Sequence, residues 1–190
     1  IMVTAAALAH ANRFPVLCVP GDVFATRGPD PVLQQIEDFQ DGTVSANDCF
    51  RPVSRYYDRI ARPEQLMTAL PRAMAAMTDP AECGPATISM CQDVQSFAYD
   101  FPEDFFAPRV WKQRRIRPDV DELAAAVEAL KGAQTPVIVA GGGVHYSQAC
   151  EALRAFVEAH NIPIVETQAG KSALPWDHPL NLGPIGVTGG

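Results

Sequence analysis

The chain has 190 residues, of which 47% are hydrophobic and 19% are charged, and its formal net charge is −7. This composition is ordinary for a globular protein. The acidic balance argues against nucleic acid or an anionic membrane surface as a partner, because both favour proteins with surplus Lys and Arg. No apolar run approaches the roughly 20 residues that a membrane span needs.

The cysteines argue against two further classes of protein. There are five of them, an odd number, widely spaced and without a CxxC pair. Structural zinc sites and disulfide frameworks use paired cysteines at regular spacing, so we expect neither, and we assign no metal ligands in this chain. Unpaired cysteines in this pattern favour a reducing cytoplasm.

The first half of the chain predicts helices alternating with short strands. Residues 2–13 are rich in Ala and free of Gly and Pro, which favours a helix. Residues 16–19 are continuously apolar, which is typical of a strand buried on both faces of a parallel sheet. Residues 31–39 are compatible with a short helix. A stronger helix is expected over residues 62–77, where apolar side chains recur at helical spacing, and residues 86–90 predict another apolar strand.

Residues 97–118 predict a linker between two parts of the chain. The segment contains prolines, scattered aromatic residues and a basic cluster. Its aromatic content indicates that it packs along a surface. The basic cluster is interpreted as a solvated or ion-paired face, because the whole chain is acidic.

The second half is more regular. Asp119 or Asp121 can cap a helix that ends near Leu130, and a strand and a glycine turn follow. Ser147 is predicted to cap the next helix, which runs to His160 and leads into another strand. This order implies parallel strands with right-handed crossovers. The predicted fold class is therefore α/β, with two incomplete three-layer units and parallel sheets, over residues 1–96 and 119–190.

The glycine turn raises the question of a phosphate-binding loop. A dinucleotide-binding turn needs G-x-G-x-x-G between a strand and a helix. Gly141 and Gly143 fit this spacing, but Tyr146 occupies the third glycine position. Gly170 precedes Lys171 and a serine, but the leading glycine of a Walker loop is missing. The favoured interpretation is a tight structural turn, with anion binding at the helix N-terminus as the alternative.

Several stretches together resemble the thiamine-diphosphate enzymes. MVTAAALAHANR leading into PVLCVPGD, and RPEQLMTALPRAM leading into GPATISMCQDVQ, resemble the C-terminal part of their pyrimidine-binding module. TPVIVAGGGVHYSQACEALRAFVEAHNIPIV and GKSALPWDHPLNLG resemble the start of their central domain. The resemblance implies that residues 1–96 belong to the first module and 119–190 to the second. GDVFATRGPDPVLQQ and RPVSRYYDRI carry a narrower resemblance to the ring-opening hydrolases of inositol catabolism, which cleave trihydroxycyclohexane-1,2-dione.

This resemblance implies a cofactor and a mechanism. Thiamine diphosphate would supply the electron sink for C–C cleavage of a cyclic dione, and Mg²⁺ would hold its diphosphate. The family's catalytic glutamate is expected upstream of Ile1, and its metal motif is expected downstream of Gly190. No catalytic, cofactor-binding or metal-binding residue is therefore assigned here, and this chain alone is expected to be inactive and to hold no cofactor tightly. The parent enzyme is expected to be a homodimer or homotetramer.

The residues carried over from the family are Gln34 and, with less weight, Gln35. They match a glutamine and its neighbour in the acetolactate synthases, where this stretch faces the substrate. Leu33 replaces an aromatic residue there, so the substrate contacts must differ. The alternative is a surface glutamine pair on a short helix.

Two other polar residues have alternative interpretations. Asp22 follows a strand, where open α/β sheets place ligands, but it is also a common turn residue, and the turn is favoured. His178 stands beside Asp177 and resembles a general base, but a loop role is favoured because sequence neighbours need not face each other. Acetolactate synthases place FAD against their central domain, but the hydrolases need no flavin and none is predicted.

Three functions remain open at this stage. The first is part of a thiamine-diphosphate hydrolase, the second is part of an acetolactate-synthase-like carboligase, and the third is a non-catalytic nucleotide-binding module. Partial sheets leave unpaired edges and uncovered apolar faces, so the chain alone is expected to self-associate or to be marginally stable.

Overall fold

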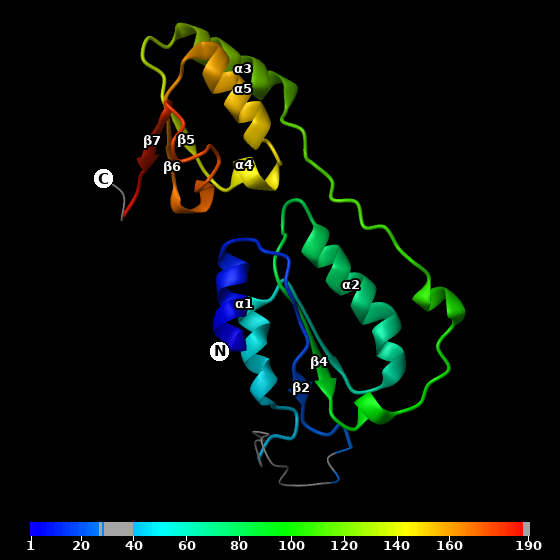
Figure 1. The fold of residues 1–190 in the computed structure, drawn as a ribbon. Coiled ribbons are helices and arrows are strands. Elements are labelled where there is room, and N and C mark those ends of the chain that lie inside the picture. Colours follow the sequence, from blue (N-terminus) through cyan, green and yellow to red (C-terminus); the bar gives the residue numbers. More distant parts are fainter. Residues whose placement is uncertain (27, 29–39, 188–190) are drawn as a thin grey trace. The chain divides into compact units, whose positions relative to one another are not determined.

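The computed structural model describes residues 1–26, 28 and 40–187. The chain divides into two compact units, Ile1–Arg114 and Arg115–Gly190, and each is described by itself (Figure 1). The helix predicted over residues 31–39 lies outside the described residues. No helix in the described part of the chain has the length and apolar character needed to cross a membrane.

Unit 1 contains a sheet whose strands are all parallel. The central strand β4 pairs on one edge with β3 and on the other with the short strands β1 and β2. The β1 and β2 pairings follow each other along β4, and Pro20 lies between them. The strands are β1 (Leu17–Cys18), β2 (Gly21–Asp22), β3 (Tyr56–Ile60) and β4 (Ala86–Cys91).

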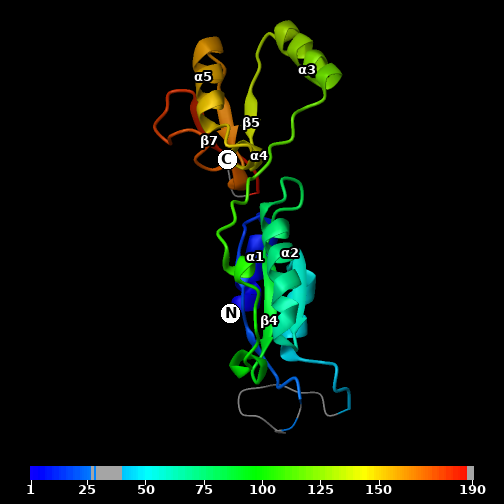
Figure 2. The same ribbon diagram turned by 90° about the vertical axis from the view of Figure 1, so that its right-hand side faces the viewer.

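Helices cover both faces of this sheet, with α1 and α2 on opposite sides (Figure 1), and Figure 2 views the sheet from the α2 side. Helix α2 buries Ala69, Ala73 and Met77 against Ile60 and Ile88. On the other face, α1 and the 3-10 helix η1 form a smaller core with β1. The helical segments of unit 1 are α1 (Met2–Ala11), η1 (Ala46–Val53), η2 (Pro63–Gln65), α2 (Leu66–Thr78), η3 (Val94–Ser96) and η4 (Glu103–Phe106).

Unit 2 has a second parallel sheet in the order β5-β6-β7. Helix α5 packs against it through Val157 and Leu153, which join Ala140, Ile164 and Leu174 in the core. The elements are α3 (Val120–Gly132), β5 (Ile138–Ala140), α4 (Gly143–Tyr146), α5 (Cys150–His160), β6 (Ile164–Glu166), η5 (Gln168–Gly170) and β7 (Asn181–Pro184). The predicted α/β class with parallel sheets is confirmed.

The structure decides which residue caps α3 and corrects the predicted cap of the helix that follows. The side chain of Asp119 accepts from the N–H groups of Asp121 and Glu122 and so caps α3. The prediction that Ser147 caps the following helix was wrong. The Ser147 hydroxyl instead donates back to the Gly143 carbonyl, and a left-handed residue, Gln148 with φ 53°, separates α4 from α5. A serine can bond back into the preceding turn as readily as forward, and here the backward bond prevails.

The predicted linker contains no α-helix or strand between residues 97 and 118. In unit 1 its aromatic side chains pack together, with Phe101 stacked on Phe105 at 5.2 Å between ring centroids. Phe105 and Trp111 line a groove with Leu70 and Met74 of α2. The aromatic residues therefore hold this segment against α2.

Candidate functional site at the carboxyl end of the first sheet

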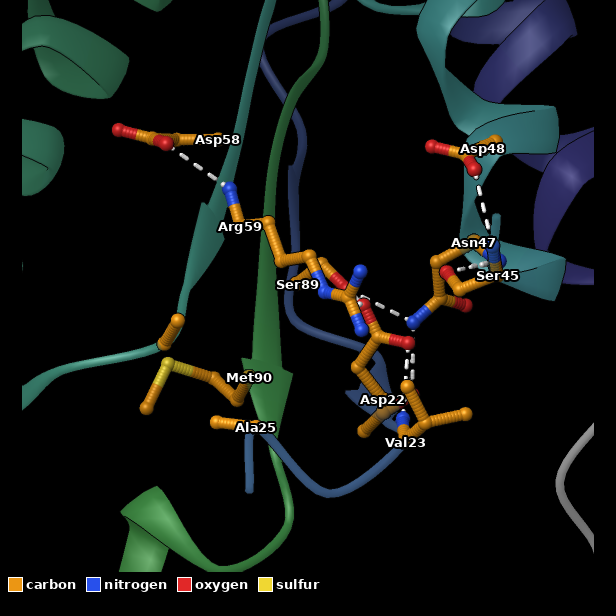
Figure 3. A network of polar contacts seen from close by, with 12 residues as sticks. Asp22, Val23, Ala25, Ser45, Asn47, Asp48, Asp58, Arg59, Ser89 and Met90 are labelled. Atoms are coloured by element: carbon orange, nitrogen blue, oxygen red, sulfur yellow. Dashed lines mark hydrogen bonds and ion pairs between the residues drawn. The ribbon is translucent and has the colours of Figure 1, made fainter. Parts of the chain in front are cut away.

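The carboxyl ends of the strands in unit 1 converge on a buried carboxylate. Asp22 is the last residue of β2 and is 4% exposed. Its Oδ2 accepts from the Ser89 hydroxyl of β4 at 2.6 Å and lies 3.0 Å from Nε of Arg59 in β3 (Figure 3). Its Oδ1 accepts from the Val23 N–H at 2.8 Å. The favoured interpretation of Asp22 as a turn residue is therefore not supported, because Asp22 belongs to β2.

A second element completes the network. The amide of Asn47 in η1 donates to the Gly21 carbonyl at 2.7 Å and to the Ser89 hydroxyl at 2.8 Å. Asn47 is held in place because Ser45 and Asp48 form a capping box at the start of η1. Hydrogen bonds between β2, β4 and η1, and the ion pair from β3, therefore join three strands and one helical segment (Figure 3).

The charges in this network favour the charged form of Arg59. Partial burial disfavours the charged guanidinium of Arg59, but the Asp22 carboxylate together with the neighbouring Cys91 and Tyr57 outweighs this effect and raises the pKa of Arg59. Burial raises the pKa of the neighbouring Tyr57 phenol. Each carboxylate oxygen of Asp22 has a partner, so the network is suited to holding the edge of the sheet in one geometry.

The segment that leaves this edge is anchored at its start. After β2, the backbone N–H groups of Ala25 and Thr26 donate to the carboxylate of Asp93, which follows β4, at 2.8 and 3.1 Å. Gln34 and Gln35, the predicted substrate-facing residues, belong to the chain that follows, and they lie outside the described residues. Their role stays a prediction. Arg59, Ser89 and Asn47 were missed, although polar residues within an apolar strand such as ATISMC are a signal for buried hydrogen bonding.

The glycine turn of unit 2 does not have the geometry of a phosphate-binding loop. The helix that follows it, α4, has four residues, so it offers few aligned N–H groups. None of the three glycines has a positive φ. A Cβ at Gly142 would lie 3.0 Å from the Tyr146 ring, whereas one at Gly143 would meet nothing within 4 Å. Steric need therefore explains one of the three glycines.

The second glycine motif has a clear packing reason. A Cβ on Gly170 would lie 2.0 Å from the carbonyl oxygen of Ala140, the last residue of β5. The Gly170 N–H donates to the Thr167 carbonyl at 3.0 Å, and the Thr167 N–H donates to the Ala140 carbonyl at 2.9 Å, so η5 is held against the strand. Gly170 thus allows two backbone segments to touch, and the resemblance to a Walker loop is coincidental.

Two further polar residues hold loops of unit 2. Glu166 is 8% exposed at the end of β6 and accepts from the N–H groups of Ser172 and Leu174 at 3.3 and 3.0 Å. His178 contacts Glu158 of α5 through Nε2 at 3.1 Å, and its Nδ1 accepts from the N–H of Leu180 at 3.2 Å. Both ring nitrogens are engaged, so His178 ties a loop to a helix.

Comparison with known proteins identifies the relationship. Residues 123–190 match the family model of the thiamine pyrophosphate enzyme central domain. The chain is 55% identical over 188 residues to a protein of Geobacillus thermodenitrificans named 3D-(3,5/4)-trihydroxycyclohexane-1,2-dione hydrolase. The chain is therefore similar to the thiamine pyrophosphate enzymes, and its second half resembles their central domain. A protein of the same name from Bacillus cereus is 57% identical, again over 99% of this chain.

The chain spans 29% of the length of these curated relatives. An X-ray structure of a protein provisionally described as a thiamin diphosphate-dependent enzyme of Mycobacterium smegmatis superimposes with a TM-score of 0.73. It covers 97% of this chain and 33% of its own, at 22% sequence identity, so it supports the fold alone. The predicted resemblance is confirmed by these findings.

The residues described here do not form a site for the metal-bound cofactor of the thiamine pyrophosphate enzymes. Among them, no group of three or more His, Cys, Asp or Glu side chains is arranged to hold a metal ion. The buried carboxylates Asp22 and Glu166 are occupied by Arg59, Ser89 and backbone N–H groups. No catalytic step is therefore derived from residues of this chain through the cofactor.

Proposed function

We propose that the full-length protein hydrolyses a C–C bond of trihydroxycyclohexane-1,2-dione and opens its ring. The observation that carries this proposal is the 55–57% identity to hydrolases of that name, sustained over 188 residues. The cofactor would be thiamine diphosphate with Mg²⁺, and when bound it supplies the electron sink for the cleavage. The 190-residue chain is proposed to be a supporting part of this enzyme.

The part that this chain plays is proposed to be the positioning of a substrate-facing segment. The network around Asp22 and the anchor at Asp93 fix the point where the chain leaves β2. Gln34 and Gln35 follow within this segment, and they are proposed to contact the dione. A fixed starting point favours this because a loop positions a side chain only as well as its ends are held.

The oligomeric state, the domain bounds and the cellular compartment are also proposed. We propose a homodimer or homotetramer, with residues 1–96 in a pyrimidine-binding module and residues 119–190 in the central domain. The five cysteines are all unpaired thiols, which is compatible with a reducing cytoplasm.

The test uses the full-length protein with thiamine diphosphate and Mg²⁺. We expect it to consume trihydroxycyclohexane-1,2-dione and to release an open-chain acid, and to lose this activity when the cofactor is omitted. Condensation of pyruvate without cleavage of the dione would favour a carboligase. Inactivity on both substrates, together with a thermal shift on adding ADP, NAD or FAD, would favour a nucleotide-binding module.

The role of Gln34 is tested separately. Replacing Gln34 with Ala is expected to raise KM for the dione more than about tenfold if its amide bonds the substrate, because a site built to hydrogen-bond a polar group loses that specific interaction. Gln40→Ala serves as the control because Gln40 is an exposed residue after the same segment. Equal kinetics for both variants would contradict the assignment of Gln34.

A further inference from the structure

A thiol and an imidazole lie together in unit 2. The Sγ atom of Cys150 is 3.6 Å from Nδ1 of His145, within the range for a sulfur hydrogen bond. The other ring nitrogen of His145, Nε2, lies 3.0 Å from the carbonyl oxygen of Lys171. The thiol, the imidazole and the carbonyl therefore form a chain of three groups.

The carbonyl decides which nitrogen of His145 carries the proton. A carbonyl oxygen only accepts hydrogen bonds, so the contact with Lys171 requires a proton on Nε2. In the neutral imidazole, Nδ1 then has a free lone pair, and this lone pair faces Cys150. The arrangement is that of a nucleophile beside a base whose orientation is fixed by a third group.

The local backbone explains why the two side chains meet. The short helix α4 carries His145, and the left-handed residue Gln148 reverses the chain before α5 begins. Cys150 is the first residue of α5, which has eleven residues and no side-chain cap at Ala149. The reversal brings residues five positions apart into contact, and the uncapped helix end adds a favourable dipole beside the sulfur.

The thiol also faces a cavity. A cavity of about 370 Å³ is lined by Cys150, Arg154, Glu166, Lys171 and Trp176, among others. Its volume lies at the lower end of the range of small-molecule sites, about 300–1,000 Å³. Cys150 is only partly buried and lines this cavity, so a low-molecular-mass reagent has a route to its side chain.

The other cysteines provide a contrast. Cys18, Cys83 and Cys91 are buried, and burial raises the pKa of each of these thiols. Cys49 is exposed, and no hydrogen-bond partner is found for its thiol in the described part of the chain. Cys150 alone among the five combines access with an adjacent imidazole.

We propose that Cys150 is a site of reversible thiol modification by a low-molecular-mass disulfide, with His145 as the base. His145 Nδ1 takes the proton of the Cys150 thiol as its sulfur attacks one sulfur of the disulfide R–S–S–R. The Cys150 S–S bond forms and the S–S bond of the reagent breaks. The leaving RS⁻ takes the proton from the imidazolium and departs as RSH. Cys150 and one half of the reagent end as a mixed disulfide, and the other half is reduced.

The test follows the thiols of the full-length protein during incubation with oxidised glutathione at neutral pH. Peptide mass spectrometry gives the rate of mixed-disulfide formation at Cys150 and at Cys49. We expect Cys150 to react at least about tenfold faster than Cys49 in the native protein, and the two rates to converge in denaturant. A Cys150 rate equal to or below that of Cys49 in the native protein overturns the proposal.

Two variants assign the role of the base. His145→Asn is expected to lower the Cys150 rate about tenfold, towards that of Cys49. His160→Asn, at the far end of the helix that begins with Cys150, is expected to leave the rate unchanged. An unchanged rate in a folded His145→Asn protein overturns the role of His145. If that variant does not fold, the native ratio of Cys150 to Cys49 in the unaltered protein still decides whether the site is reactive.

Discussion

A single carboxylate, Asp22, joins the strands of unit 1 at their carboxyl ends. Replacing Asp22 with Asn keeps its shape and its contact with Val23 but removes the charge that faces Arg59. Breaking a buried ion pair by removing one partner typically costs about 3–5 kcal/mol, and the Arg59 side chain is 22% exposed, which limits the cost. We expect the free energy of unfolding of unit 1 to fall by about 3 kcal/mol in urea titrations.

The control for Asp22→Asn is a variant that breaks an ion pair at the surface of the same unit. Glu82 is 70% exposed and lies 3.2 Å from Arg55, so Glu82→Gln is expected to change the free energy of unfolding by less than about 0.5 kcal/mol. Equal effects of the two variants would show that the Asp22 network contributes no more than a surface pair.

Asp93 makes the anchor after β2 dependent on pH. Partial burial favours its neutral form, but the N–H donors of Ala25, Thr26 and Val94 outweigh this and hold the pKa of Asp93 below its usual range. A carboxyl group with a lower pKa in the folded state stabilises that state above the unfolded pKa, which is about 3.9. This stabilisation is lost as pH falls through the folded pKa.

We therefore expect Asp93→Asn to lower the melting temperature at pH 7, and the difference from the unaltered chain to shrink as pH falls below about 4. Thermal melts followed by circular dichroism at several pH values measure this difference. A difference that stayed constant from pH 7 to pH 3 would mean that the charge of Asp93 does not contribute.

Among the elements, η5 depends on the close approach of Gly170 to the backbone of β5 at Ala140. Gly170→Ala would place a Cβ 2.0 Å from the Ala140 carbonyl, which is backbone and cannot rotate away. Overpacking of this kind costs about 1–3 kcal/mol, and we expect the upper part of this range for unit 2. Gly132→Ala in α3 is the matched control, because a Cβ there meets nothing within 4 Å and Ala favours helix. Equal melting temperatures for the two variants would contradict the packing role of Gly170.

The sequence was informative for elements whose cores are apolar. The helix over 2–13, the helix ending near Met77 and the strand at 86–90 correspond to α1, α2 and β4. Strand β3, Tyr56–Ile60, was missed because its polar side chains disguise it. The Tyr56 hydroxyl donates to Asp58 at 2.9 Å, and Arg59 pairs with Asp22. The polar groups of this strand are therefore satisfied inside the fold, in the case of Arg59 by a partner distant in sequence.

The same reasoning explains why the sequence pointed to Asp22 but not to the residues that contact it. The position of Asp22 after a strand was visible in the sequence, but its partners Ser89 and Arg59 lie 67 and 37 residues away. Only the parallel register of β2, β3 and β4 brings them together. Periodicity along the chain carries no signal for that register.

At the scale of the molecule, unit 2 exposes two apolar surfaces. Helix α3 has no buried residue, and Leu123 and Leu130 on its apolar stripe are 51% and 43% exposed. On the sheet, Val139 of β5 and Leu182 of β7 are 55% and 64% exposed. Large exposed apolar surfaces are normally covered by other protein, and these side chains are candidates for such a surface.

We therefore expect the 190-residue chain alone to self-associate. Sedimentation at increasing concentration should show a rising mean mass, because burying these surfaces removes apolar area from water. Leu123→Lys combined with Leu130→Lys should shift the association to at least about tenfold higher concentration, since two charges would have to be buried or left unpaired. Glu128→Lys is the control, because it adds positive charge to an exposed position of the same helix without touching the apolar stripe. A chain that stayed monomeric throughout, or an equal effect of the control, would mean that the stripe of α3 does not drive association.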